Sequence, residues 1–225
     1  MAFMTPVPSQ EAALKYTLTV AKLFPGHLML GGHSKGGNLA VYASMMSPSR
    51  IQNRIISIYS HDGPGFRDNV FSSTGYRNIS DRIFKTLPQS SLVGMLLEHQ
   101  EDYTIIRSSG VGIVQHNPYT WIVKDSDFIR LTTLTPGASY RNRTLSDWLA
   151  GLTNEQREQF VDALYSVISA SDFTSFTDFC DNWQSELVSL IENMKNMDES
   201  SKEILRETLR TLRRMAIKNS FLNLH

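Results

Sequence analysis

The chain has 225 residues, of which 41% are hydrophobic and 20% charged, enough for one sizeable core. Its 22 basic and 22 acidic residues cancel, which excludes the net charge typical of proteins that bind nucleic acid or anionic membranes. The single cysteine, Cys180, excludes an internal disulfide and is typical of a reducing compartment.

No segment has the pattern of a signal peptide or a membrane span. The N-terminal sequence "MAFMTPVPSQ" lacks a basic start and is interrupted by Pro6 and Pro8. No apolar run approaches the roughly 20 residues that span a bilayer. We therefore expect a soluble cytoplasmic protein with no transmembrane segment and no nucleic-acid partner.

The first 142 residues predict strands that alternate with helices. Amphipathic patterns predict helices over 9–23, with Ser9 as its N-cap, and over 38–46. Apolar and β-branched runs predict strands over 27–32, 54–60, 102–109 and 120–125. This alternation indicates an α/β fold with a parallel sheet that is covered on both faces.

After about residue 143 the pattern becomes helical. Residues 153–156 fit a capping box, and amphipathic helices are expected over 157–168, 176–194 and 202–217. We therefore expect two domains, an α/β core over 1–142 and a helical cap or outer layer over 143–225.

The sequence "GGHSKGG" lies between the strand predicted over 27–32 and the helix that follows it. Gly32, Ser34 and Gly36 satisfy G-x-S-x-G, and this position is the setting of a nucleophile elbow. Side chains two residues before and two after the serine are expected to clash in so sharp a turn. The turn places Ser34 at the positive end of the helix, where the backbone N–H of Lys35 would stabilise an oxyanion by roughly 3–4 kcal/mol.

Two other interpretations of this turn remain open. It could be a glycine-rich turn that only packs well, or a cradle for a ligand. A phosphate loop requires G-x-x-x-x-G-K-[ST], and Lys35 precedes the last glycines instead of following them. The pattern implies neither a metal nor an organic cofactor.

A serine nucleophile requires an imidazole base, and His116 is the best candidate. It follows a predicted strand in the loop "GVGIVQHNPYTW", near the carboxyl edge of the sheet. His61 is a competing base, whereas His33 is expected to be a packed spacer that points away from the exposed side of the serine. His99 lies in a polar stretch and His225 ends the chain.

The third member of the triad is an acid, for which Asp62 is the first candidate. It directly follows the strand after the elbow, and Gly63, Pro64 and Gly65 would hold it in a fixed turn. Its alternative role is to cap that turn. Asp102, Asp125 and Asp127 are alternative acids near the later strands.

Four segments together resemble an uncharacterised bacterial family of lipase-like α/β-hydrolases. They are "GHSKGGNLAVYAS", "IYSHDGPGF", "LVGMLLEH" and "GVGIVQHNPYTW", and the similarity runs from about residue 8 to 170. The resemblance implies an α/β-hydrolase fold and a triad of Ser34, Asp62 and His116.

The chain departs from this family in one respect. Only about 30 residues precede Ser34, so we expect the first four strands of a complete α/β-hydrolase to be missing. The elbow strand would then be a bare edge that is prone to pair with another chain, so we expect self-association or a longer natural form. A second oxyanion donor would also be missing, which predicts low turnover.

These residues predict a serine hydrolase that acts on esters or thioesters of a small or lipid-like acyl group. The rival prediction is a non-catalytic hydrolase-like scaffold that binds a partner or a lipid. A peptidase is a weaker third possibility.

Overall fold

The computed structural model describes residues 7–66, 68–91, 93–95, 102–110 and 112–135, and single positions from Thr144 to Arg210. The chain forms two compact units, one of residues 2–138 and one of residues 139–225 together with Met1.

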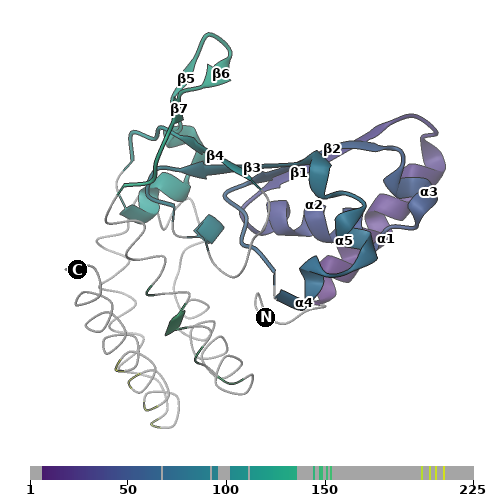
Figure 1. The fold of residues 1–225 in the computed structure, drawn as a ribbon, viewed down its shortest axis with the longest axis horizontal. Coiled ribbons are helices and arrows are strands. Elements are labelled where there is room, and N and C mark those ends of the chain that lie inside the picture. The colour runs from purple at the N-terminus through teal and green to yellow at the C-terminus, as the bar shows by residue number, and fades with distance from the viewer. Residues whose placement is uncertain are drawn as a thin grey trace. The chain divides into compact units, whose positions relative to one another are not determined.

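A five-stranded sheet organises the first unit (Figure 1). In spatial order its strands are β1 (Leu28–His33), β2 (Ile55–His61), β3 (Ile83–Pro88), β4 (Tyr103–Ile106) and β7 (Arg130–Leu131). The first four strands are parallel, and β7 pairs antiparallel with β4. The predicted α/β class and its mostly parallel sheet are thus confirmed.

Strand β3 was not predicted from the sequence, and neither were the two-residue strands β6 (Asp127–Phe128) and β7. The prediction placed strands at β1, β2 and β4, but β3 was missed because Lys85 interrupts its apolar run. Lys85 is only 2% exposed in the folded chain. The strand predicted over 120–125 is reduced to β5 (Val123–Lys124), which forms a separate hairpin with β6 (Asp127–Phe128). Both residues of β5 are exposed, so burial of apolar side chains does not stabilise a longer strand here.

The described residues of the first unit include five α-helices. They are α1 (Pro8–Leu23), α2 (Lys35–Met46), α3 (Ser49–Gln52), α4 (Asp68–Phe71) and α5 (Thr74–Arg77). The prediction that Ser9 is the N-cap of α1 is wrong, because Ser9 already lies within the helix. Val7 is the N-cap, and its backbone N–H donates to the Gln10 side chain at 3.1 Å. Pro8 is suited to the first helical position, which explains the earlier start.

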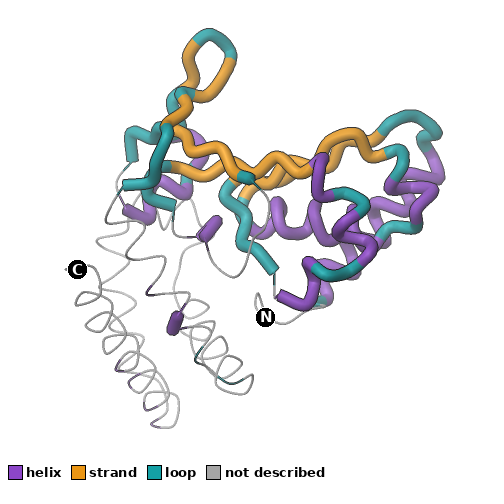
Figure 2. The backbone as a smooth tube through the Cα atoms, viewed as in Figure 1, coloured by secondary structure: helices purple, strands orange, loops and turns teal. Residues whose placement is uncertain are grey.

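Within the first unit, helices α1 to α5 lie on one side of the sheet (Figures 1 and 2). Helix α2 packs against β1 and β2, and Val41 and Ile58 are almost completely buried between them. On the opposite face Tyr59 and Phe84 are 37% and 51% exposed. The predicted cover on both faces is therefore found on one face only, within the part of the chain that the structure describes.

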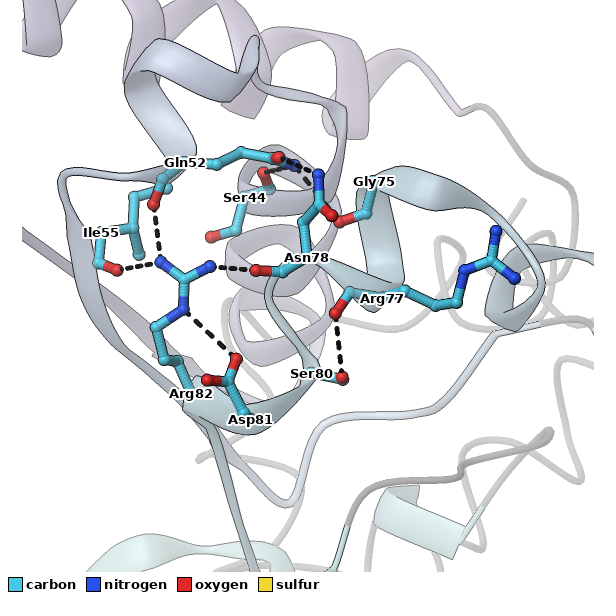
Figure 3. Close-up of polar contacts among 9 residues, drawn as sticks. All are labelled: Ser44, Gln52, Ile55, Gly75, Arg77, Asn78, Ser80, Asp81 and Arg82. Carbon is cyan, nitrogen blue, oxygen red and sulfur yellow. Dashed lines mark hydrogen bonds and ion pairs between the residues drawn. The ribbon is translucent and has the colours of Figure 1, made fainter.

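The buried side chain of Gln52 holds the C-terminal end of α2 (Figure 3). Its Nε2 donates to the carbonyl oxygens of Ser44 and Met45 at 3.1 and 2.9 Å, and to that of Gly75 at 3.2 Å. The Asn78 amide donates to Gln52 Oε1 at 3.2 Å. Because the last carbonyls of a helix have no partner within it, Gln52 satisfies groups that burial would otherwise penalise.

Arg82 connects the same region to the start of β2 (Figure 3). Its guanidinium donates to the carbonyl oxygens of Gln52 and Ile55, both at 2.6 Å, and to that of Asn78. These bonds connect the end of α3 and the C-cap of α5 to the start of β2.

In the second unit the described positions Glu199, Glu203, Arg206 and Arg210 are helical. The carboxylate of Glu203 lies 3.7 Å from Arg206 and 3.6 Å from Arg210, and these side chains are well exposed. This agrees with a solvated face on the helix predicted over 202–217. The helices predicted over 157–168 and 176–194 lie outside the described residues. Among the residues that are described, no helix is both long and apolar enough to cross a membrane.

Candidate active site

Ser34 occupies a strained turn directly between β1 and α2. Its φ and ψ angles are 56° and −128°, a conformation that a residue with a side chain rarely adopts. The Ser34 N–H donates to the His61 carbonyl at 2.9 Å, and the Ser34 carbonyl accepts from the Gly37 N–H at 3.0 Å. The side chain is partly exposed at the surface of the first unit. A strand, a strained turn and a helix in this order are what the sequence predicted around Ser34, and a nucleophile elbow requires this arrangement.

Glycines surround the turn because neighbouring backbone approaches closely. A Cβ on Gly32 would lie 2.4 Å from the carbonyl carbon of Gly36, so no other residue fits there. A Cβ on Gly63 would lie 2.6 Å from Ser60 Oγ and 3.0 Å from the Ser34 carbonyl oxygen. The expected clash at Gly36 is wrong, because a Cβ there would meet nothing within 4 Å. The backbone of Gly36 occupies the space that a side chain on Gly32 would need, whereas a side chain on Gly36 would meet open space.

Lys35 is the first residue of α2, and its side chain is exposed. The N–H groups in the first turn of a helix have no partner within that helix, and the helix dipole places partial positive charge there. The Lys35 N–H therefore follows the serine at the position where an oxyanion donor is expected.

Asp62 lies at the end of β2 and is completely buried. Its φ angle is 48°, and its N–H donates to the Thr86 carbonyl of β3 at 2.8 Å. Asp62 Oδ2 lies 2.6 Å from His116 Nδ1. Because a carboxylate only accepts, a neutral His116 ring carries its proton on Nδ1 and its lone pair on Nε2. This is the tautomer that a general base requires.

The other carboxylate oxygen of Asp62 is held by two donors from the segment after β3. Ser91 Oγ donates to Oδ1 at 2.5 Å, and the Gly94 N–H donates at 3.1 Å. The prediction did not include either residue, although Gly94 lies in the quoted segment "LVGMLLEH". The sequence feature that could have indicated this contact is Gly94 itself, because a glycine often marks a close approach of the backbone to another group. A Cβ on Gly94 would lie 2.3 Å from Asp62 Oδ1.

His116 is the last residue of a 3₁₀-helix, η3 (Gly112–His116), and is only 3% exposed. The preceding residue, Gln115, anchors this helix. Its side chain donates to the Gly110 carbonyl at 3.0 Å and accepts from the Ser90 N–H at 2.9 Å. The indole N–H of Trp121 donates to the Gln115 carbonyl at 2.8 Å.

His33 does not simply fill space, as the sequence suggested. Its Nε2 lies 2.7 Å from the carbonyl oxygen of His116, and the two ring centroids are 4.5 Å apart. Burial lowers the pKa of His33, and a proton on the nearby His116 ring would oppose protonation of His33 further. At neutral pH the His33 ring is therefore uncharged.

His61, the competing base, lies in an aromatic cluster. Its ring centroid is 6.0 Å from Trp121, 6.1 Å from Tyr59 and 6.3 Å from Phe128. Burial lowers its pKa, so this ring is also uncharged at neutral pH. Its contribution to the elbow is the backbone carbonyl that binds the Ser34 N–H.

The alternative acids lie at exposed positions. Asp102 precedes β4, and Asp125 lies in the turn of the β5–β6 hairpin. The pKa of Asp127 is lowered first by the hydrogen bond from the Phe128 N–H and then by that from Arg130, which lies 3.0 Å away. The structure thus brings Asp62, rather than these residues, to the ring of His116. His99 and His225 lie outside the described residues.

Two further features bear on ligands. Within the described residues, no group of three or more His, Cys, Asp or Glu side chains could hold a metal ion.

A pocket of about 480 Å³ lies over β2, β3 and β4, and its lining includes His61, Phe84 and Phe128. Neither Ser34 nor His116 lines it, so this pocket is separate from the predicted nucleophile.

The family model that matches this chain is described as Mbeg1-like and covers residues 1–166. No curated protein and no solved structure is similar enough to count as a match.

Proposed function

We propose that this chain, which belongs to the Mbeg1-like family, is a serine hydrolase of α/β-hydrolase-like fold that cleaves carboxylic esters or thioesters. Ser34 is the nucleophile, His116 the general base and acid, and Asp62 the residue that orients His116. The main support is the buried 2.6 Å contact between His116 Nδ1 and Asp62 Oδ2. The His116 loop is itself bound to the residue that precedes Ser34.

The reaction has two stages. Ser34 Oγ attacks the carbonyl carbon while its proton passes to His116 Nε2, and the tetrahedral intermediate then expels the alcohol or thiol. His116 protonates this leaving group as the carbon–oxygen or carbon–sulfur bond breaks. Water then attacks the acyl-enzyme with His116 again as base, and release of the acid restores Ser34.

Asp62 and the uncharged neighbouring rings favour the positive charge that develops on His116. The carboxylate stabilises the imidazolium across their hydrogen bond. His33 and His61 have pKa values below the ordinary value for histidine, so neither ring adds a second positive charge at neutral pH. Their neutrality avoids a repulsion that would oppose proton transfer.

The N-terminal end of α2 supports the developing negative charge. The Lys35 N–H follows Ser34 at the start of the helix and is aimed at the oxyanion in our proposal. One such donor contributes roughly 3–4 kcal/mol to stabilisation of the transition state. A second donor usually comes from a strand beside the elbow strand, and β1 pairs only with β2 among the described strands. We therefore expect low turnover.

Labelling with a fluorophosphonate, followed by intact-mass measurement, tests this proposal. We expect one adduct on the wild type and none on Ser34→Ala. Ser49→Ala is the matched control, because it makes the same change at an exposed position on α3, and it should label like the wild type. Failure of the folded wild type to label would overturn the proposal and favour the non-catalytic scaffold.

A panel of chromogenic esters, thioesters and peptides of graded acyl length then defines the substrate class. Turnover of esters or thioesters, abolished by Ser34→Ala, is the expected result. Turnover of peptides alone would overturn the assignment as an esterase and indicate a peptidase.

A further inference from the structure

We propose that His33, the residue directly before the nucleophile, is a positioning residue that holds His116 in place through its main chain. The catalytic consequence rests on the proposed function, whereas the positioning itself does not.

Two contacts join these residues, which are 83 positions apart in sequence. His33 Nε2 lies 2.7 Å from the His116 carbonyl oxygen, and the two rings are 4.5 Å apart at an interplanar angle of 38°. A carbonyl oxygen only accepts, so Nε2 carries the proton and donates. His33 comes from β1 and His116 from η3, so the bond connects the strand of the nucleophile to the segment of the base.

The segment that carries His116 depends on such external bonds. A 3₁₀-helix has poorer hydrogen-bond geometry than an α-helix and is used in short pieces, so η3 is weakly held by its own backbone. The Gln115 side chain fixes the helix to Ser90 and Gly110, and Trp121 binds the Gln115 carbonyl. None of these bonds reaches β1, whereas that of His33 does.

The surroundings of His33 keep its ring in the form that this bond requires. Trp121 contacts the His33 ring edge-on, with centroids 5.9 Å apart. Burial lowers the pKa of His33, and its ring is less readily protonated still when His116 carries a proton. A neutral ring with its proton on Nε2 donates to the carbonyl and places no second positive charge beside the imidazolium of His116.

Two variants separate the hydrogen bond from the packing of the ring. His33→Phe keeps an aromatic ring and removes the donor, whereas His33→Gln removes the ring and keeps an N–H donor at a similar distance along the side chain. His27→Phe is the matched control, because His27 is exposed before the other end of β1.

The first readout is the strongly deshielded NMR proton of the hydrogen bond between His116 and Asp62, which does not depend on activity. We expect this signal in the wild type, His33→Gln and His27→Phe, and its loss or broadening in a folded His33→Phe. Retention in both His33 variants would overturn the proposal. Loss in both would also overturn it, because the donor would then not be the feature that matters.

The second readout is the rate of fluorophosphonate labelling, resolved into the maximal inactivation rate and the probe concentration at half-maximal rate. In His33→Phe the maximal rate should fall between about 10- and 100-fold, because small misplacements of reacting groups have effects of this size. The half-maximal concentration should not change, and His33→Gln should recover the rate.

The two readouts distinguish failure of this inference from failure of the proposed function. An unchanged NMR signal and an unchanged rate in His33→Phe would refute the positioning role and leave the hydrolase intact. A wild type that does not label, combined with selective loss of the NMR signal in His33→Phe, would refute the hydrolase and support the positioning role.

Discussion

The backbone N–H of Gly94 donates to Oδ1 of Asp62 at 3.1 Å, although the two residues follow different strands. The other oxygen of the same carboxylate lies 2.6 Å from His116. The segment after β3 therefore fixes the acid, and the acid fixes the imidazole. A substitution at Gly94 that moves the Asp62 carboxylate should therefore also move the His116 ring.

Gly94→Ala is expected to impair the site more than the fold. Its Cβ would lie 2.3 Å from both Asp62 Oδ1 and Leu87 Cδ2, so the carboxylate must move. Overpacking of this kind costs about 1–3 kcal/mol of stability. We expect the labelling rate to fall by about 100-fold, measured with fluorophosphonate under conditions where the variant is folded.

Gly26→Ala is the control for this change, because nothing lies within 4 Å of its Cβ position. It should label at the rate of the wild type. Unchanged labelling of Gly94→Ala would contradict the role of this segment in orienting Asp62.

The two glycines of the G-x-S-x-G pattern should respond in opposite ways to alanine. In Gly32→Ala the new Cβ meets the backbone of Gly36 at 2.4–2.8 Å, which no side-chain rotation relieves. In Gly36→Ala the Cβ is free, and alanine favours a helix over glycine by roughly 0.5–1 kcal/mol. Thermal unfolding should show a lower midpoint for Gly32→Ala and an equal or higher one for Gly36→Ala. Equal losses in both variants would refute this geometry of the elbow.

Gln52→Leu tests the polar network at the end of α2. The change keeps a side chain of similar size but leaves the carbonyls of Ser44 and Met45 without this donor. The Met45 carbonyl loses this donor, whereas the Ser44 carbonyl still accepts from the Ser47 N–H at 3.3 Å. Because burial of one group without a partner costs about 1–3 kcal/mol, unfolding in urea should show a loss in that range. The matched control is Asn53→Leu at the exposed neighbouring position, which should change stability by less than about 0.5 kcal/mol.

His61 should make the stability of the fold depend on pH. Burial lowers its pKa in the folded chain below the ordinary value of 6.5, so the unfolded chain binds the proton first. The contribution of neutral His61 to the free energy of unfolding is fully present above pH 6.5. It is lost as the pH falls from there toward the lower pKa of the folded state.

His61→Phe keeps an aromatic ring in the cluster and removes the titrating group, so the slope of stability against pH should decrease in that range. Unfolding in urea at a series of pH values measures the slope. The exposed His27→Phe provides the control, and an equal change of slope there would count against burial as the cause.

The β1 edge is expected to support self-association. Among the described strands β1 has a neighbour on one side only, and Met29 on this strand is 67% exposed. A lysine on an edge strand opposes pairing with another strand, so Met29→Lys should reduce the mass measured by light scattering at high concentration. Phe84→Lys places the same charge on β3, inside the sheet, and should have little effect. A monomeric wild type at every concentration would contradict self-association.

Local chemistry in the sequence was sufficient to place the elbow. An apolar strand, a glycine-rich turn and a helix follow one another within about twenty residues, and each is governed by periodicity and steric limits of neighbouring residues. The strands β1, β2 and β4 could be predicted for the same reason. Strand β3 could not, because the burial of Lys85 depends on neighbours from other strands.

The sequence also supplied His116 and Asp62 as candidates, but it left other bases and acids beside them. The contact between the two residues spans 54 positions and depends on the sheet, whose parallel register places the ends of β1 and β2 side by side. The roles of Ser91, Gly94 and His33 follow from the same arrangement.

The sequence by itself determined which residues have the chemistry of a nucleophile, a base and an acid. Only the tertiary structure decided which of them meet, because hydrogen bonds between distant segments depend on strand register and loop packing, and no local pattern encodes either.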